Sequence, residues 1–199
     1  MRMIGLLGGV ASGKSFVARR LEALGAGVLD ADRAGHQALR MPRVEGAARQ
    51  RWGEQVFGPD GRIDRDKLAS IVFSSALGAE NEREYLEKLT HPLIKDLLEA
   101  QKTRFVDDGF VAAVLDAPLL LEAGWDDFCD ILVLIETLRE LRLARSLIRG
   151  WSEEDFDTRE DAQESLDLKR ERADVKIDNS GSPEQTEAQV ERFWHTLFG

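Results

Sequence analysis

The chain has little cysteine and no long apolar run. Cys129 is the single cysteine among 199 residues, so the chain cannot form an internal disulfide or a cysteine metal cluster. The longest apolar stretch, 110–121, is interrupted by Asp116 and Pro118 and is too short to cross a bilayer. The sequence therefore predicts a cytoplasmic protein without membrane contact.

Positive charge is also scarce. The chain carries 27 Lys and Arg against 37 Asp and Glu, a formal net charge of −10. Proteins that bind nucleic acid through its backbone usually show a basic excess, so we expect no nucleic-acid partner. The hydrophobic content of 43% is that of a globular protein, and 199 residues suffice for one α/β domain with an insertion. We expect a monomer or a small homo-oligomer.

A phosphate-binding pattern lies near the N-terminus. Residues 8–15 fit the P-loop motif and stand between an apolar strand at 3–7 and an expected helix at 16–24. Its glycines let backbone N–H groups approach a phosphate chain, and the helix N-terminus adds partial positive charge. We expect Lys14 to bridge the β- and γ-phosphates and Ser15 to bind Mg²⁺. The predicted ATP-binding residues of this segment are Gly9, Val10, Ala11, Ser12, Gly13, Lys14, Ser15 and Phe16.

Short apolar runs alternate with helical patterns along the rest of the chain. Further strands are expected at 28–29, 110–115, 131–135 and 175–177, and a last helix is expected from Pro183. The stretch 43–108 is helical, with a break expected at Pro92, and is too long for a simple connection. The predicted fold class is α/β: a P-loop NTPase-type, doubly wound, five-stranded parallel sheet with an inserted helical substrate-binding subdomain and a helical lid. Ligands should bind at the carboxyl ends of the strands.

Carboxylates follow two of these strands. In 30–32, Asp-Ala-Asp, an extended chain would point both carboxylates the same way, whereas a helix starting here would make one of them an N-cap. A carboxylate near the γ-phosphate can orient an attacking hydroxyl and accept its proton. Asp116 ends the third strand, where it could help to hold the metal or could only form a turn before Pro118.

Arginines follow the fourth strand. Arg142, Arg145 and Arg149 are spaced to share one face of a helix expected over 136–149. Such arginines are often only solvated. Against the acidic average, and directly after a strand, they suit a mobile lid that clamps phosphate as it closes. Packing is expected from other positions of this helix: Leu138, Leu141, Ala144 and Ile148.

Three classes of nucleotide-binding protein compete at this stage. A GTPase would need an Asn-Lys-x-Asp segment to recognise guanine, and the sequence has none. A non-catalytic nucleotide-binding module would need neither a carboxylate pair beside the loop nor an arginine-bearing lid. The residues alone favour a small-molecule kinase that uses MgATP, with sugar, nucleoside and nucleotide acceptors all open.

The chain resembles the dephospho-coenzyme A kinase family almost from end to end. The likeness is carried by the phosphate loop at 7–15, Asp-Ala-Asp at 30–32, Thr-His-Pro within 89–93, Ala-Pro-Leu-Leu-Leu-Glu at 117–122, and Gln163, Lys169 and 173–181 near the C-terminus. The resemblance implies transfer of the ATP γ-phosphate to the ribose 3′-hydroxyl of dephospho-CoA, the final step of CoA biosynthesis. It also implies Mg²⁺ as cofactor and ATP and dephospho-CoA as partners.

The resemblance further implies roles for single residues. Asp32, Lys14 and Arg145 would be catalytic, with Asp32 at the acceptor hydroxyl. Beyond the phosphate loop, ATP would be bound by Arg145, Arg149, Asn179 and Gly181. The acceptor would be bound by Asp32, His36, His91, Pro118 and Leu120.

The same likeness divides the chain into three parts. The nucleotide-binding core is expected at about 1–35, 110–137 and 175–199, the acceptor-binding insertion at about 36–109, and the lid at about 138–174. Three positions depart from the family's usual residues: Phe16 replaces Thr, Gly150 replaces an acidic residue, and Ser165 replaces Pro. These departures concern the lid and the loop's flank, not the reaction.

Overall fold

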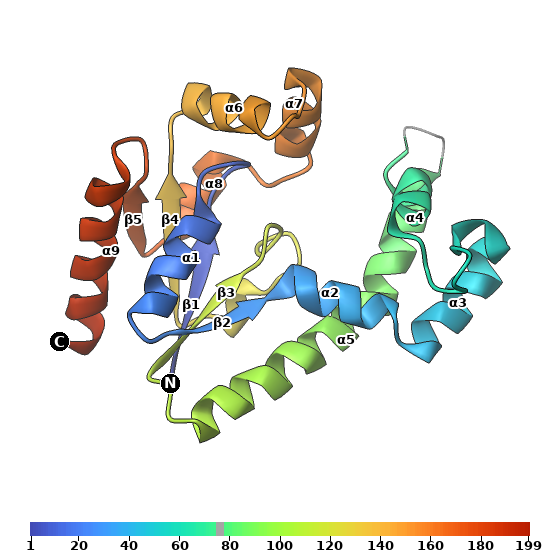
Figure 1. Cartoon of the computed structure of the whole chain (residues 1–199), viewed down its shortest axis with the longest axis horizontal. Coiled ribbons are helices and arrows are strands. Elements are labelled where there is room, and N and C mark those ends of the chain that lie inside the picture. The colour runs from blue at the N-terminus through green and yellow to red at the C-terminus, as the bar shows by residue number, and fades with distance from the viewer. Residues whose placement is uncertain (75–77) are drawn as a thin grey trace. The chain divides into compact units, whose positions relative to one another are not determined.

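A parallel sheet forms the centre of the fold. The computed structural model describes residues 1–74 and 78–199. Five strands pair in the order β2-β3-β1-β4-β5, all parallel (Figure 1). The strands are β1 Arg2–Leu7, β2 Gly27–Asp30, β3 Ala112–Asp116, β4 Ile131–Glu136 and β5 Val175–Asp178. The predicted sheet is therefore confirmed. β1 lies at its middle, between β3 and β4.

One face of the sheet is covered by the first and last helices. α1 (Lys14–Ala23) contributes Val17 and Leu21, and α9 (Pro183–Phe198) contributes Val190, to a cluster with alternate strand residues such as Ile4 and Leu6. Alternation follows because neighbouring side chains of a strand point to opposite faces. The fully buried strands read as nearly continuous apolar runs, as parallel sheets require.

Three further helices follow β4. α6 (Arg139–Ile148), α7 (Glu153–Asp161) and α8 (Leu166–Arg172) lie in the segment 138–174 that the family resemblance implies as the lid. Glu136 does not begin a helix, because it pairs with Asp178 in the sheet. Ser152 and Ser165 accept hydrogen bonds from backbone N–H groups at the starts of α7 and α8, so each starts a new helix as an N-cap.

Contacts between Cα atoms divide the chain into two compact units. Unit 1 holds 1–30 and 102–199, and unit 2 holds 31–101. Unit 2 contains α2 (Ala31–Leu39), α3 (Pro42–Trp52), the 3₁₀ helix η1 (Gly53–Val56), α4 (Arg65–Val72) and most of α5 (Ala79–Asp107). Its own core includes Ala48, Trp52, Val56 and Leu68. A second short 3₁₀ helix, η2, covers Asp126–Phe128 in unit 1.

The expected helix break at Pro92 is wrong. α5 continues through Pro92, which lacks the N–H that would donate within the helix. Two residues earlier, Thr90 Oγ1 donates to the carbonyl of Leu86 at 2.8 Å, a side-chain bond that often accompanies a bend in a helix. No helix of 1–74 or 78–199 is long and apolar enough to span a bilayer.

Candidate active site

The phosphate loop has the backbone geometry that the glycines predicted. Gly13 takes a φ of 98°, and Ala11 is the non-glycine residue with a positive φ, 56°, within the described residues. A side chain at Gly13 would also collide with the amide of Asn179. Both the positive φ and this close approach favour glycine at position 13. Within the described residues, no side chain caps the start of α1. Its first N–H groups are therefore available to an anion.

Lys14 lies folded over this loop. Its ammonium donates to the carbonyls of Gly8 at 2.8 Å and Gly9 at 3.2 Å. Burial lowers the pKa of Lys14 to about 8, with Lys169 acting in the same direction and Asp116 opposing. A phosphate group would restore the charged form, because an adjacent negative charge raises the pKa of an amine.

Ser15 and Asp116 meet at the carboxyl end of the sheet. Ser15 Oγ donates to Asp116 Oδ2 at 3.3 Å, and Asp116 stands in register with Asp30 of the edge strand. In the described part of the chain, no three His, Cys, Asp or Glu side chains form a metal cluster. One hydroxyl and one carboxylate still fit Mg²⁺, which keeps several waters and takes its other ligands from phosphates.

The carbonyl of Ser12 gathers donors from three later segments. Asn179 Nδ2 donates to it at 2.7 Å, Thr137 Oγ1 at 2.8 Å and Arg145 at 3.3 Å. Arg145 also donates to the carbonyl of Asn179 at 2.8 Å. The structure thus brings the predicted residues Arg145 and Asn179 to the loop. Thr137 was missed, and only its place directly after β4 could have drawn attention to it.

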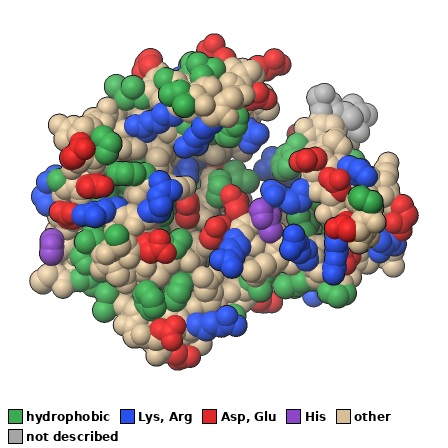
Figure 2. Space-filling model, in the orientation of Figure 1, with side chains coloured by type: hydrophobic (Ala, Val, Ile, Leu, Met, Phe, Trp, Pro, Cys, Tyr) green, Lys and Arg blue, Asp and Glu red, His purple; other side chains and the backbone are tan. Residues whose placement is uncertain are grey.

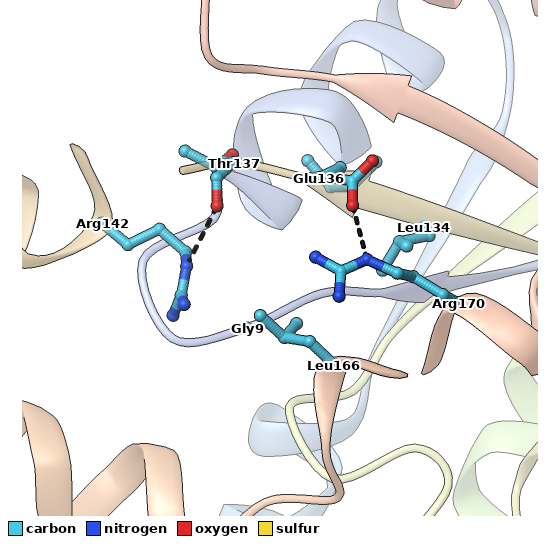
Figure 3. Close-up of a pocket in the computed structure, with 8 residues that line it drawn as sticks. Gly9, Leu134, Glu136, Thr137, Arg142, Leu166 and Arg170 are labelled. Atoms are coloured by element: carbon cyan, nitrogen blue, oxygen red, sulfur yellow. Dashed lines mark hydrogen bonds and ion pairs between the residues drawn. The ribbon is translucent and has the colours of Figure 1, made fainter. Parts of the chain in front are cut away.

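Arg142 does not behave as a lid arginine. Only 2% of its side chain is exposed, and its guanidinium donates to the carbonyl of Thr137 at 3.2 Å and pairs with Glu160 of α7 at 2.5 Å. A side chain at Gly9 would come within 2.7 Å of it. Figure 3 shows the guanidinium groups of Arg142 and Arg170 pointing toward Gly9 from either side.

The faces of α6 are therefore the reverse of those expected. Its buried residues are Arg142 and Ser146, whereas Leu138 is 60% exposed and Ile148 is 86% exposed. Ala144 is exposed as well, and Leu141 is half-buried. The prediction that these four residues form the packing face is wrong, because hydrogen bonds and ion pairs to the loop and α7 hold the polar face inward. Figure 2 shows Lys and Arg side chains gathered between α6 and α1, with acidic side chains over α7.

The other predicted ATP-binding residues vary in setting. Arg149 is exposed at the end of α6. Burial lowers the pKa of Arg145, and the charge of Arg149 lowers it further. A side chain at Gly181 would displace the side-chain amide of Gln185. Phe16 is half-buried against the core, so its place beside Ser15 is structural. Their contact with ATP stays a prediction.

The predicted acceptor residues fall in both units. In unit 2, Asp32 is exposed in the first turn of α2, His36 follows one turn later, and His91 is half-buried in α5. In unit 1, Pro118 is exposed, whereas Leu120 is 2% exposed and packs beside Gly5. The helix begins at Ala31, so the extended arrangement of 30–32 is wrong and Asp30 takes the position before the first helical residue.

Comparison with known proteins decides the family. The sequence profile of the dephospho-CoA kinase family matches residues 2–185. The chain belongs to the dephospho-CoA kinase family. A dephospho-CoA kinase of Geobacter sulfurreducens is 40% identical over 100% of both chains. One of Symbiobacterium thermophilum is 41% identical over 100% of this chain and 82% of its own length.

Solved structures agree with this family fold. A Thermus thermophilus protein of known crystal structure shares 33% identity, covers 100% of this chain and 98% of its own, and superposes with a TM-score of 0.85. A dephospho-CoA kinase from Campylobacter jejuni, 24% identical, superposes with a TM-score of 0.73 over 99% of this chain and 98% of its own. At that identity the second likeness speaks for the fold alone.

Proposed function

We propose that the chain transfers the γ-phosphoryl group of ATP to the ribose 3′-hydroxyl of dephospho-CoA, giving ADP and CoA. The observation that carries the proposal is the ordered phosphate loop, with Ser15 facing Asp116 at the strand ends, in a chain of this family. The loop holds the donor, and the strand ends are where ligands of such sheets bind.

Each part of the site has a distinct role in this proposal. Lys14 and the first N–H groups of α1 bind the phosphates and stabilise the charge that develops as the phosphoryl group moves. Asp32 orients the acceptor hydroxyl and takes its proton. Arg145 and Asn179 fix the loop at Ser12 and border the nucleotide. Mg²⁺, held by Ser15 and Asp116, would neutralise negative charge on the phosphates when it is bound.

A product assay tests the proposal directly. The purified chain with MgATP should form ADP when dephospho-CoA is added, and mass spectrometry should show one phosphate added at the ribose. Adenosine, shikimate and gluconate should give far less ADP. Turnover with one of these and none with dephospho-CoA would reject the assignment. The variant Lys14→Ala should lose phosphoryl transfer, and its survival would reject the role of the loop.

A further inference from the structure

Lys169 lies buried beside the phosphate loop without a role in the site described above. Its helix, α8, places Leu166 and Arg170 in the pocket that Gly9 and Arg142 also line (Figure 3). Only 2% of the Lys169 side chain is exposed. A buried ammonium destabilises the folded protein unless its partners compensate for the lost water. The hydrogen bonds and ion pairs of Lys169 therefore show whether its ammonium is fully satisfied in the empty protein.

The partners of Lys169 leave it incompletely satisfied. Its ammonium donates to Gln163 Oε1 at 3.0 Å, and it lies 3.5 Å from Glu122 Oε1. The same Glu122 oxygen also accepts the backbone N–H of Glu164 at 2.6 Å. Glu122 Oε2 is buried and accepts no hydrogen bond within the described residues. An ammonium has three donors, so Lys169 can take a further anionic partner.

Lys169 also lies close enough to Lys14 for the two to repel. Lys169 is, after burial, the largest influence that lowers the pKa of Lys14, and Arg142 acts on both lysines. Like charges with little solvent between them destabilise the empty protein. An anion bound between them would turn this repulsion into attraction. The polyphosphate of the nucleotide is the anion that the neighbouring loop is built to hold.

We propose that Lys169 is a second phosphate-binding lysine, which contacts the terminal phosphate of ATP and stabilises the transferred phosphoryl group. The proposal rests on the proposed function for the identity of the nucleotide. Glu122, which holds Lys169, lies in the segment that follows β3 and Asp116. Lys169 is thus held by a segment other than those of Arg145 and Asn179, which hold the loop at Ser12. Glu122 and Gln163 hold the ammonium until nucleotide binds.

Nucleotide binding without acceptor tests this role. Calorimetry should show that Lys169→Met weakens a non-hydrolysable ATP analogue at least ~10-fold and ADP less than ~3-fold. Lys169→Arg should recover part of the analogue affinity. Lys176→Met removes an exposed lysine of β5 and should change neither. With dephospho-CoA, kcat of Lys169→Met should fall about 10²-fold.

Thermal unfolding separates this role from packing alone. Without nucleotide, the double variant Lys169→Met/Glu122→Gln should keep or raise Tm, because both charges of the buried pair and the repulsion of Lys14 are removed together and no buried carboxylate is left without its cation. Equal loss of affinity for the analogue and ADP, or a lowered Tm with an unchanged ratio of affinities, would overturn the proposal. The binding measurements need no acceptor. If the affinities change as expected but dephospho-CoA is not phosphorylated, only the acceptor assignment is rejected.

A second variant covers the case in which Lys169→Met does not fold. Glu122→Gln removes the carboxylate that competes with phosphate for Lys169 and keeps the side chain's shape. The proposal requires this variant to bind the ATP analogue more tightly relative to ADP than the unchanged chain does. An unchanged or lower ratio would contradict it.

Discussion

At the scale of single residues, the two acidic side chains around Ala31 differ in their setting. Asp30 ends β2 in register with Asp116, whereas Asp32 is exposed in the first turn of α2. If Asp32 accepts the acceptor's proton, Asp32→Asn should lower kcat at least ~10²-fold with ATP affinity nearly unchanged. Steady-state kinetics and calorimetry measure the two quantities. Asp30→Asn is the matched control, and a larger loss in that variant would move the role to Asp30.

His91 should make stability depend on pH. Burial lowers the pKa of His91, with Arg83 acting in the same direction and Glu87 opposing. The unfolded chain then binds the proton more readily than the folded one, so the free energy of unfolding should fall as pH drops below about 6.5. Denaturant unfolding at pH 7.5 and 5.5 should show a larger loss for the unchanged chain than for His91→Gln. Equal losses would show that His91 does not titrate differently on folding.

At the scale of elements, α6 and α7 are joined by one buried and one exposed arginine. Arg142 is 2% exposed and pairs with Glu160, whereas Arg139 is 48% exposed and pairs with Asp157 at 2.5 Å. Removing the partner of a buried charge costs about 3–5 kcal/mol, and an exposed pair contributes about 0–1 kcal/mol. Because Arg139 also contacts Glu160, the upper part of the range is expected for Glu160→Gln.

Chemical denaturation measures that difference. Glu160→Gln should lower the free energy of unfolding by roughly 3 kcal/mol or more, and Asp157→Asn by less than roughly 1 kcal/mol. Similar losses in both variants would mean that water reaches Arg142 and that the burial of the pair has little energetic effect.

Pro92 offers a second test on an element. A proline inside a helix removes one hydrogen bond and crowds the preceding turn, so Pro92→Ala should stabilise the protein by about 1–2 kcal/mol. For a chain of this size, that gain corresponds to a rise in Tm of roughly 2–8 °C. Calorimetry measures the change, and Pro183→Ala, at the first position of α9, should give no such rise. A fall in Tm would show that the turn at Pro92 is stabilised by the proline itself.

The sequence predicted where strands and helices occur better than it predicted which side of a helix is buried. Apolar runs identified β1, β3 and β4, because buried parallel strands need such runs on both faces, whereas the partly buried edge strands β2 and β5 gave only two or three residues each. The orientation of α6 was mispredicted because the burial of Arg142 depends on Glu160 and on carbonyls of distant segments, which no local pattern contains.

Gly150 is explained only by its backbone: it takes a φ of 85° after α6, so an acidic residue there would be strained.

At the scale of the whole molecule, the phosphate loop depends on residues near the other end of the chain. Asn179 donates to Ser12, and its own oxygen accepts from Thr186 of α9 at 2.9 Å. Asn179→Ala should weaken ATP affinity about tenfold, since each lost hydrogen bond contributes about 1 kcal/mol and the loop would also lose order. The control Gln189→Ala should leave ATP affinity unchanged. The Gln189 amide donates to the carbonyls of Asp178 and Gln185 and accepts the N–H of Asp178. Similar affinities of the two variants would contradict this dependence.

The site was predictable only where its signal is local. Lys14 and Ser15 belong to the P-loop motif, whose spacing alone indicates phosphate and Mg²⁺ binding, so the sequence was sufficient to predict their roles. Thr137 reaches the loop only through the sheet order, and the burial of Lys169 depends on Gln163 and Glu122. One sequence read in order does not contain these distances. Asp32 and His91 stay predictions, because their evidence is the family pattern.

The arrangement of the sheet has a consequence for synthesis of the chain. β1 leaves the ribosome first, yet its neighbours are β3 and β4, and the loop after it is fixed by Asn179. Chains emerge at about 5–20 residues per second, so the motif is exposed for several seconds before its partners exist. Nucleotide cannot assist the early steps of folding, and nascent chains stalled before residue 179 should not be retained on an ATP matrix.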